Sequence, residues 1–288
     1  MTEPVCYLEP TRSWRDDGVL RRNLALVIVA VLIVVFARAS HVDPQKLWAG
    51  VPLLASWVPS MFPPDLRSIG EILYAAFETL SMASIGTLIA LAFAFPLGFL
   101  AARNTTPHPL VSVAARALLN VTRGTETLVF ALVFVAAIGF GPFTGVLAIA
   151  FHMMGAIGKA FAEAIEPADK GPMDAVALTG ASRLKVIRYA LIPDVAPNLI
   201  AATLYMWEYT VRSSTVLGIV GAGGIGQTLK DTIDLLDFPK MITVLTVILL
   251  MVWMIDSLSA YLRGAVLEPP RADPRRIPRR AISGDSHA

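Results

Sequence analysis

Long apolar runs separated by short polar segments recur along the chain, and this pattern predicts membrane-spanning helices. A helical run of about 20 apolar residues matches the hydrocarbon core of a bilayer. Six runs are candidates, and we place them at Leu20–Ala37, Phe77–Ala102, Thr125–Gly139, Val146–Ala164, Ala196–Val216 and Met241–Tyr261. The third run is short, and Pro96 predicts a kink in the second. The pattern therefore predicts an all-α polytopic membrane protein with six transmembrane helices.

Composition agrees with this prediction, and the placement of charge orients it. The chain is 55% hydrophobic and 16% charged, whereas soluble domains carry about 25% charged residues. Lys and Arg gather in three segments that the six spans place on one side of the membrane, 12–22, 159–188 and 263–280. Because cytoplasmic loops are enriched in Lys and Arg, we expect both termini to be cytoplasmic.

The predicted spans divide the chain into five regions. We expect a cytoplasmic tail over 1–19, a first transmembrane helix over 20–38, an extracytoplasmic interfacial segment over 39–70, a core with five transmembrane helices over 71–265, and a disordered basic cytoplasmic tail over 266–288. Trp48 and Trp57 favour the membrane interface for the third region. The first run also has the features of a signal peptide, with a candidate cleavage site at 37–39. Either interpretation orients the other spans alike.

A glycine-rich stretch, TVLGIVGAGGIGQTLKD, follows the fifth span. Gly221, Gly223 and Gly226 match the dinucleotide-binding pattern G-x-G-x-x-G. Such a site also needs a strand on each side of its first helix, and a nicotinamide cofactor would have to be available outside the cytoplasm. Neither condition fits the predicted topology. We therefore expect either a flexible turn or, preferably, a close-packed structural turn made by Gly221, Gly223, Gly224 and Gly226.

Two ionisable residues in the fifth span are candidates for the transport pathway of a membrane protein. Glu208 and Arg212 lie four residues apart and hence on one helix face. Charged residues within a span usually face a protein interior or a water-filled cavity. Either the two neutralise each other as an ion pair, or Arg212 with Ser213 and Ser214 makes weak, transient contacts with a passing anion.

Other polar residues in the spans are weaker candidates for the same pathway. His152 in the fourth span either lines a cavity or forms a hydrogen bond between helices, and Thr79 opens the second span. Arg123 and Glu126 flank the start of the third span, where they form either a gate or an interfacial ion pair. We find no metal site, catalytic triad or paired carboxylates, which argues against an enzyme embedded in the membrane.

The longest polar segment between spans, 165–195, has helical spacing interrupted by Gly180. Asp174 can cap a turn and residues 175–178 can form a short helix. An ordinary amphipathic connector between two spans would have the same pattern.

This segment resembles the coupling loop of ABC importer permeases, whose pattern is E-A-A, three residues, G, nine residues, I-x-L-P. Asp174, Ala175 and Val176 stand at the E-A-A positions, and Gly180 and Pro193 keep the spacing. Asp for Glu, Val for the second Ala, and residues 190–192 for I-x-L depart from it. The residues that the resemblance assigns to coupling with an ATPase are Asp174, Ala175, Val176, Gly180, Ala181, Leu191 and Pro193.

A longer resemblance covers about residues 78–264. FVAAIGFGPFTGVLAIAFH, GKAFAEAIE, ALTGASRLKVIRYALIP and WEYTVRSSTVLGIVGAGGIG are similar to the permeases of phosphonate importers, the PhnE type. The resemblance implies a type I ABC importer permease fold in a bacterial plasma (inner) membrane. It also implies a second permease copy, which we expect to be identical, two cytoplasmic ATPase subunits and an extracytoplasmic phosphonate-binding protein.

The chain has no G-x-x-x-x-G-K-[ST] phosphate loop. We therefore expect no cofactor in this chain, with ATP and Mg bound by the partner ATPase. Besides the lipid bilayer and these subunits we expect no nucleic-acid partner. A permease for methionine or another amino acid, and a purely structural membrane scaffold, remain as alternatives.

Overall fold

Every regular element that the structure describes is helical, as the sequence predicts. The computed structural model describes residues 14–40 and 44–267. Residues 1–13 of the predicted N-terminal tail and 268–288 of the predicted basic tail therefore lie outside the described residues. The chain divides into two compact units, Met1–Pro59 and Ser60–Ala288.

The first unit contains α1 (Trp14–Ala39) and α2 (Pro44–Trp57). Its segment Arg21–Ala39 is long and apolar enough to cross a membrane, and none of that segment is buried in the structure. Exposed apolar surface of this extent is stable only against lipid or another protein. α2 contains Pro52 and has 14 residues, which is about 21 Å of helix and too short for a bilayer core of about 30 Å.

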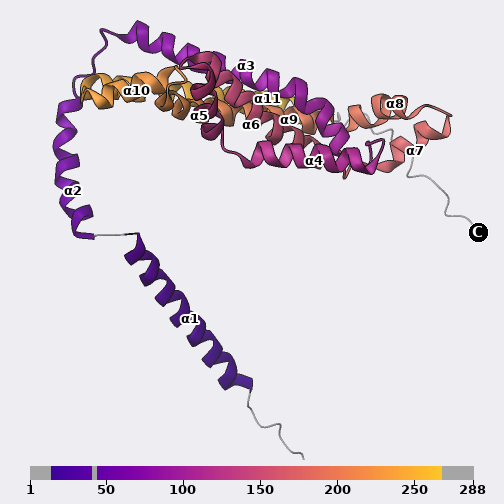
Figure 1. Cartoon of the computed structure of the whole chain (residues 1–288), viewed down its shortest axis with the longest axis horizontal. Helices are drawn as coiled ribbons and strands as arrows, with labels where there is room; N and C mark the ends of the chain where they lie inside the picture. Colours follow the sequence, from indigo (N-terminus) through magenta and orange to yellow (C-terminus); the bar gives the residue numbers. More distant parts are fainter. Residues whose placement is uncertain (1–13, 41–43, 268–288) are drawn as a thin grey trace, which may run out of the picture. The chain divides into compact units, whose positions relative to one another are not determined.

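The second unit is a bundle of helices (Figure 1). A short 3-10 helix, η1 (Pro59–Met61), lies at the junction with the first unit. The elements that follow are α3 (Ile69–Ala101), α4 (Pro109–Gly124), α5 (Thr127–Ile138), α6 (Pro142–Ile165), α7 (Lys170–Leu178), α8 (Arg183–Val186), the π-helical turn η2 (Ile187–Leu191), α9 (Ile192–Leu217), the 3-10 turn η3 (Gly218–Val220), α10 (Ile225–Asp234) and α11 (Phe238–Leu267). Figure 1 shows α7 and α8 at one end of this bundle and α10 at the other.

α6 is the central helix of the bundle, since it packs against α3, α4, α5 and α9. Small residues let α3 approach it closely. A Cβ atom at Gly86 would lie 2.6 Å from Cγ2 of Ile149, and one at Gly98 would lie 2.8 Å from Cβ of Phe161. Lipid gives membrane helices little hydrophobic reason to associate, so they depend on such close packing. α3 continues as one helix through Pro96.

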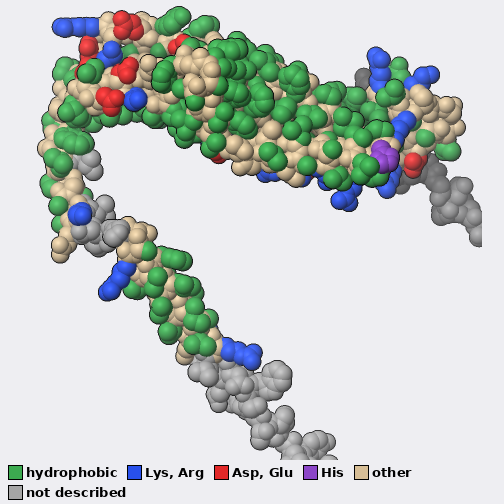
Figure 2. All heavy atoms as spheres, in the orientation of Figure 1, with side chains coloured by type: hydrophobic (Ala, Val, Ile, Leu, Met, Phe, Trp, Pro, Cys, Tyr) green, Lys and Arg blue, Asp and Glu red, His purple; other side chains and the backbone are tan. Residues whose placement is uncertain are grey.

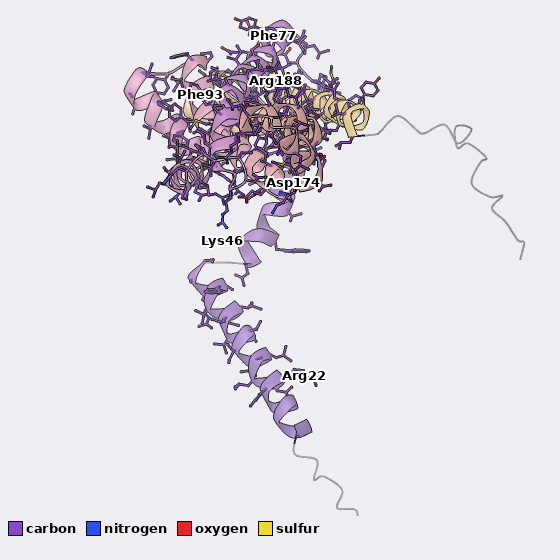
Figure 3. The ribbon with its side chains drawn as sticks, turned by 90° about the vertical axis from the view of Figure 1, so that its right-hand side faces the viewer. Arg22, Lys46, Phe77, Phe93, Asp174 and Arg188 are labelled. Carbon is purple, nitrogen blue, oxygen red and sulfur yellow. The ribbon has the colours of Figure 1, made fainter. Side chains whose placement is uncertain are left out.

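The side chains on the surface of the bundle are distributed as in a membrane protein. Figure 2 shows hydrophobic side chains over its middle, with most Lys, Arg, Asp and Glu toward its two ends. Figure 3 views the bundle from the end that carries α7 and α8, and labels Asp174 and Arg188.

The six predicted spans are confirmed only in part. Within the residues that the structure describes, four helices are long and apolar enough to cross a membrane, namely α1 from Arg21, α3, α6 and α11, and the bent pair α4–α5 makes up to five. The predicted third span corresponds to α5, which has only 12 residues, or about 18 Å. The predicted fifth span lies in α9, which is long enough but carries Asp194, Glu208 and Arg212.

Candidate functional site

The segment assigned to ATPase coupling forms short helices with an exposed tip. Asp169, not Asp174, caps α7, because its Oδ1 accepts a hydrogen bond of 2.9 Å from the backbone N–H of Gly171. The predicted cap at Asp174 was therefore wrong, and Asp174, Ala175 and Val176 lie inside α7. None of the residues of α7 is buried, and Leu178 at its end is 89% exposed.

Gly180 ends this helix by its backbone conformation. Its φ is +78°, in the left-handed region that glycine adopts at little cost. Nothing lies within 4 Å of a Cβ atom built at this position, so the turn requires glycine for its dihedral angles and not for space. Ala181 then leads into α8.

The base of the segment is anchored in the hydrophobic core. Leu191 is 1% exposed and belongs to the main core cluster, and Pro193 lies in the first turn of α9, directly after the π-helical turn η2. The residues that the motif singles out thus fall into an exposed arm, 174–176, and a fixed base, 191–193.

Residues that the sequence did not single out fasten this base to the α3–α4 loop. Arg183 Nη2 donates to the carbonyl oxygen of Thr106 at 2.6 Å, and Asn104 Nδ2 donates to that of Ile165 at 2.8 Å. Glu166 accepts a hydrogen bond of 3.0 Å from the backbone N–H of Arg103 and forms an ion pair with Arg116. The predicted cytoplasmic loops are therefore connected to one another.

These contacts change the pKa of Glu166, which follows the last residue of α6. Burial raises the pKa, but the hydrogen bond from the Arg103 backbone and the positive charge of Arg116 lower it by more. The pKa of the carboxyl group therefore lies below its ordinary value, and the ionised form is favoured.

Glu208 and Arg212 belong to a group of four charged side chains between α9 and α11. Arg212 Nη2 lies 3.5 Å from Glu208 Oε1 and 3.2 Å from both carboxylate oxygens of Asp256. Arg263 Nη1 donates to Glu208 Oε2 at 2.8 Å and to Ser259 Oγ at 2.7 Å. Two positive and two negative charges balance here, so Arg212 presents no uncompensated charge to an anion.

The hydroxyl groups near Arg212 are also engaged. Ser213 Oγ and Ser214 Oγ both donate to the carbonyl oxygen of Thr210, at 3.1 and 2.6 Å. The structure thus places Glu208 and Arg212 together and directs the two serine hydroxyls to the backbone of their own helix.

The glycine stretch forms a turn that α3 caps. The backbone N–H groups of Gly224 and Ile225 donate to Glu78 Oε2 at 3.0 Å and to Thr79 Oγ1 at 2.8 Å. These two side chains satisfy donors at the N-terminus of α10. Gly221, Gly223 and Gly224 have positive φ.

Gly226 is required by close packing. A Cβ atom at Gly226 would lie 1.8 Å from the carbonyl oxygen of Thr215. No strand occurs within the described ranges 14–40 and 44–267, so a dinucleotide site has no support here.

His152 lies in the middle of α6 and is buried. Its Nδ1 is 2.8 Å from the carbonyl oxygen of Thr125, in the short connection where the chain turns by 85° from α4 into α5. With Nδ1 protonated, His152 donates this hydrogen bond and fixes the bend.

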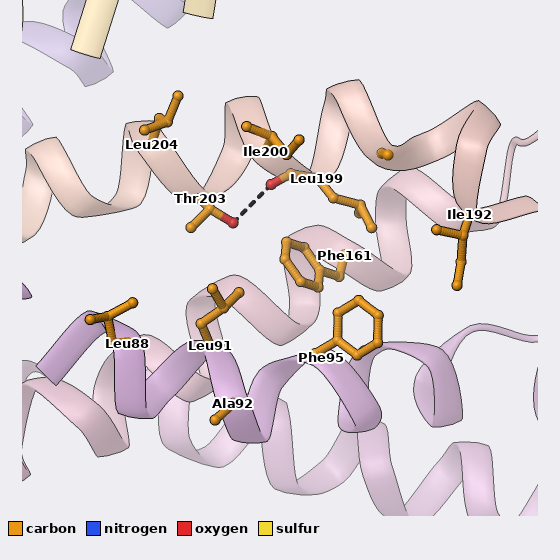
Figure 4. Close-up of a pocket in the computed structure, with 11 residues that line it drawn as sticks. Leu88, Leu91, Ala92, Phe95, Phe161, Ile192, Leu199, Ile200, Thr203 and Leu204 are labelled. Carbon is orange, nitrogen blue, oxygen red and sulfur yellow. Dashed lines mark hydrogen bonds between the residues drawn. The ribbon is translucent and has the colours of Figure 1, made fainter. Parts of the chain in front are cut away.

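A pocket of about 690 Å³ opens between α3, α6 and α9 (Figure 4). Its walls are apolar, and Thr203, the one residue of the lining with a polar side chain, donates its hydroxyl to the carbonyl oxygen of Leu199 at 2.8 Å. This pocket offers nothing to bind an anion. Among the described residues no group of three or more His, Cys, Asp or Glu side chains could hold a metal ion.

A bundle of helices with a packed core, an apolar surface around its middle and charged side chains toward its ends is typical of an integral membrane protein. Residues 94–267 match the family described as binding-protein-dependent transport system inner membrane component. The chain belongs to this family. It is thus a permease subunit of a transporter in the inner membrane and not an enzyme.

Three curated relatives cover most of the chain. HtxC of Stutzerimonas stutzeri, named as a phosphite transport system permease protein, is 60% identical over 92% of this chain and 94% of its own length. PtxC of the same species, a phosphite transport system permease protein, is 40% identical over 87% and 89%. PhnE of Mycolicibacterium smegmatis, a phosphate-import permease protein, is 41% identical over 87% of this chain and 48% of its own length.

Solved structures show the same fold. An inward-facing structure of the MetNI methionine ABC transporter contains a chain that matches 71% of this chain and all of its own length, with a TM-score of 0.62 and 20% identity. The family and this structural similarity confirm the predicted type I importer permease fold. The relatives confirm the predicted resemblance to permeases for phosphorus oxyanions.

Proposed function

We propose that this chain forms the membrane pathway of an ATP-driven importer for phosphite, a phosphonate or a related phosphorus oxyanion. The observation that carries the proposal is the 60% identity with HtxC over nearly the whole of both chains. The names of HtxC, PtxC and PhnE all refer to small phosphorus oxyanions. Within this class, the solute depends on the binding protein that delivers it.

The exposed arm of the segment 165–195 is the surface on which we place the ATPase. α7 buries none of its side chains, although its flanks are anchored by Leu191 and by the contacts of Arg183 with the α3–α4 loop. An exposed short helix on a fixed base can transmit the movement of a partner into the packed helices as a rigid body. ATP and Mg would be bound by that partner.

The remaining assembly follows from this proposal. Six spans, with α9 crossing as the fifth and α4–α5 as a broken third, would leave both termini and α7 in the cytoplasm. The binding protein would deliver solute at the opposite end, near α10. A second permease chain, in our proposal an identical copy, would enclose the pathway and cover the charged face of α9 and α11.

A methionine permease is the second candidate, since the MetNI transporter has this fold. Its support is weaker: the MetNI structure is 20% identical, and MetI of Vibrio cholerae, named as a probable D-methionine transport permease, is 27% identical over 54% of this chain, whereas HtxC and PtxC are 60% and 40% identical over most of it.

Uptake by the whole transporter tests the proposed cargo. The permease is reconstituted in vesicles with its cognate ATPase and binding protein, and ATP-dependent uptake of phosphite, methylphosphonate, phosphate and methionine is compared. We expect uptake of at least one phosphorus oxyanion and none of methionine. The reverse result would overturn the proposal.

The same vesicles test the coupling arm through Gly180. Gly180→Val forces a branched side chain into the left-handed region, at a cost of about 1–2 kcal/mol in local conformation. We expect uptake and stimulated ATP hydrolysis to fall together, by about tenfold or more. Gly171→Ala is the matched control, because Gly171 lies in α7 without a positive φ and should retain activity. Full activity of Gly180→Val would argue against coupling at this segment.

A further inference from the structure

The bend between α4 and α5 lies at the depth of the middle of the bundle. It is fixed by the hydrogen bond between His152 and the carbonyl oxygen of Thr125. His152 is the eleventh of the 24 residues of α6, which places it about 15 Å from one end of this span and about 20 Å from the other. The polar segment Arg123–Thr127 is thus held at a depth where lipid offers no hydrogen bonds.

One hydroxyl in this segment has no partner. Thr127 is 3% exposed, and its Oγ1 is buried without a hydrogen bond among the described contacts. Threonines elsewhere in the bundle, such as Thr203 and Thr210, donate to a carbonyl oxygen of their own helix. Thr127 lacks this option because it is the first residue of α5. A buried polar group without a partner is destabilising unless a ligand or water pairs with it.

The backbone at the same place also offers free donors. The side chain of Glu126 makes no capping hydrogen bond to α5. No acceptor for the backbone N–H of Thr127 or Leu128 occurs among the described contacts. α5 has 12 residues, so its N-terminus carries the partial positive charge of a helix dipole. Free N–H groups and this dipole together favour an anion.

Arg123, in the last turn of α4, adds a full positive charge. Arg116, Arg212 and Arg263 each form an ion pair with a carboxylate. Arg123 forms none with any described residue, and the ion pair with Glu126 that the sequence allowed is not formed in the structure. Arg123 is exposed on the surface of this chain, so its guanidinium, which no described carboxylate neutralises, is free to pair with an anion.

We propose that the α4–α5 bend is a transient anion site, in which Arg123, the Thr127 hydroxyl and the first N–H groups of α5 bind a phosphorus oxyanion in transit. This site rests on the proposed function for the class of anion. Arginine and a helix N-terminus both match the several acceptor oxygens of such a group. The nearby carboxylate of Glu126 opposes the same charge, which keeps the site weak enough to release its anion. His152 is a positioning residue that holds the bend.

Two variants of the reconstituted transporter test the site, by uptake of phosphite or whichever oxyanion the wild type carries. Arg123→Gln and Thr127→Val should each lower the initial uptake rate by about tenfold or more, as for loss of a hydrogen bond to a charged group. Arg123→Lys should retain more uptake than Arg123→Gln. Thr203→Val, which removes a hydroxyl bonded to its own helix, should transport at the wild-type rate.

Thermal stability separates binding from structure. Since Thr127→Val removes an unpartnered buried hydroxyl without changing shape, it should melt at or above the wild-type temperature while transporting more slowly. A lower melting temperature would mean that the hydroxyl has a structural partner, and would overturn the site. Wild-type uptake in both Arg123→Gln and Thr127→Val would overturn it too, with the proposed function intact. Failure of the wild type itself to carry any phosphorus oxyanion would instead reject the proposed function.

Discussion

At the scale of single residues, Glu166 connects three segments that are far apart in the sequence. Its carboxylate accepts from the Arg103 backbone and pairs with Arg116, next to the base of the coupling segment. The pKa of this group is lower in the folded protein than in the unfolded chain. The stabilisation is therefore complete above the ordinary carboxyl pKa and is lost as the pH falls through the lowered folded value.

We predict that Glu166→Gln lowers the stability of the purified permease at pH 7. The loss should be at most about 1 kcal/mol, because the pair is partly exposed to solvent. The difference from the wild type should shrink as the pH is taken below about 4.5, where the unfolded carboxyl is protonated. Thermal melting of both proteins across this range measures it.

Glu163→Gln is the control for this experiment. Among the described residues Glu163 pairs only with Lys159 on the same helix, with its side chain 62% exposed, so its removal should change the melting temperature little at any pH. An equal effect of the two substitutions, or a gap for Glu166→Gln that grows on acidification, would contradict the role given to Glu166.

Sequence reasoning could find some residues of these sites but not their partners. Glu208 and Arg212 are four residues apart, and their proximity follows from helical spacing alone. Asp256 and Arg263 join them only because α11 packs on α9. In the same way, the sequence places Glu78 near the start of the second predicted span. Only the packing of the helices shows that its carboxylate accepts a hydrogen bond at the N-terminus of α10.

At the scale of elements, the four charges between α9 and α11 act as one neutral group that joins the two helices. Glu208 accepts from Arg263 while also facing Arg212. We predict that Glu208→Gln destabilises the permease by about 1–3 kcal/mol, because Arg263 loses its carboxylate partner in a poorly hydrated place. Thermal or denaturant unfolding in detergent measures this loss.

A second substitution should restore part of that stability. In Glu208→Gln combined with Arg263→Gln no unpaired charge is left on this pair, so the double variant should be more stable than the sum of the single effects predicts. Additive losses would mean that the two side chains do not interact.

The elements themselves were predicted unevenly, for physical reasons. α3, α6 and α11 have continuous apolar composition, and the spans predicted from Phe77, Val146 and Met241 coincide with them to within one residue or lie inside them. α4 is amphipathic and lies between the predicted second and third spans, where the sequence predicted no element, although it packs on α6. The 85° bend at Thr125 depends on His152, which is 27 residues away, and no local pattern records such a contact. α2 lies in the segment 39–70, for which the sequence predicted a place at the membrane interface and no particular element.

At the scale of the whole molecule, the proposed mechanism requires α7 and α10 to face opposite sides of the membrane. Figure 1 shows them at opposite ends of the bundle. Leu178 and Leu235 are 89% and 78% exposed at these two ends, so that a cysteine at either place can react. The chain has one native cysteine, Cys6, which makes a cysteine-free background simple to obtain with Cys6→Ser.

In that background, Leu178→Cys should react with a membrane-impermeant maleimide only in inside-out vesicles, and Leu235→Cys only in right-side-out vesicles. The reason is that α6 and α9 both cross between these ends in the proposed topology, and that Lys and Arg concentrate on the side of α7. Ala90→Cys, which is 0% exposed in the core of α3, should react from neither side and controls for leakage of the reagent. If Leu178→Cys reacted from outside, α7 could not meet an ATPase. If Leu178→Cys and Leu235→Cys reacted from the same side, α7 and α10 would both lie on that side of the membrane. α9, which lies between them in the chain, could then not cross the membrane.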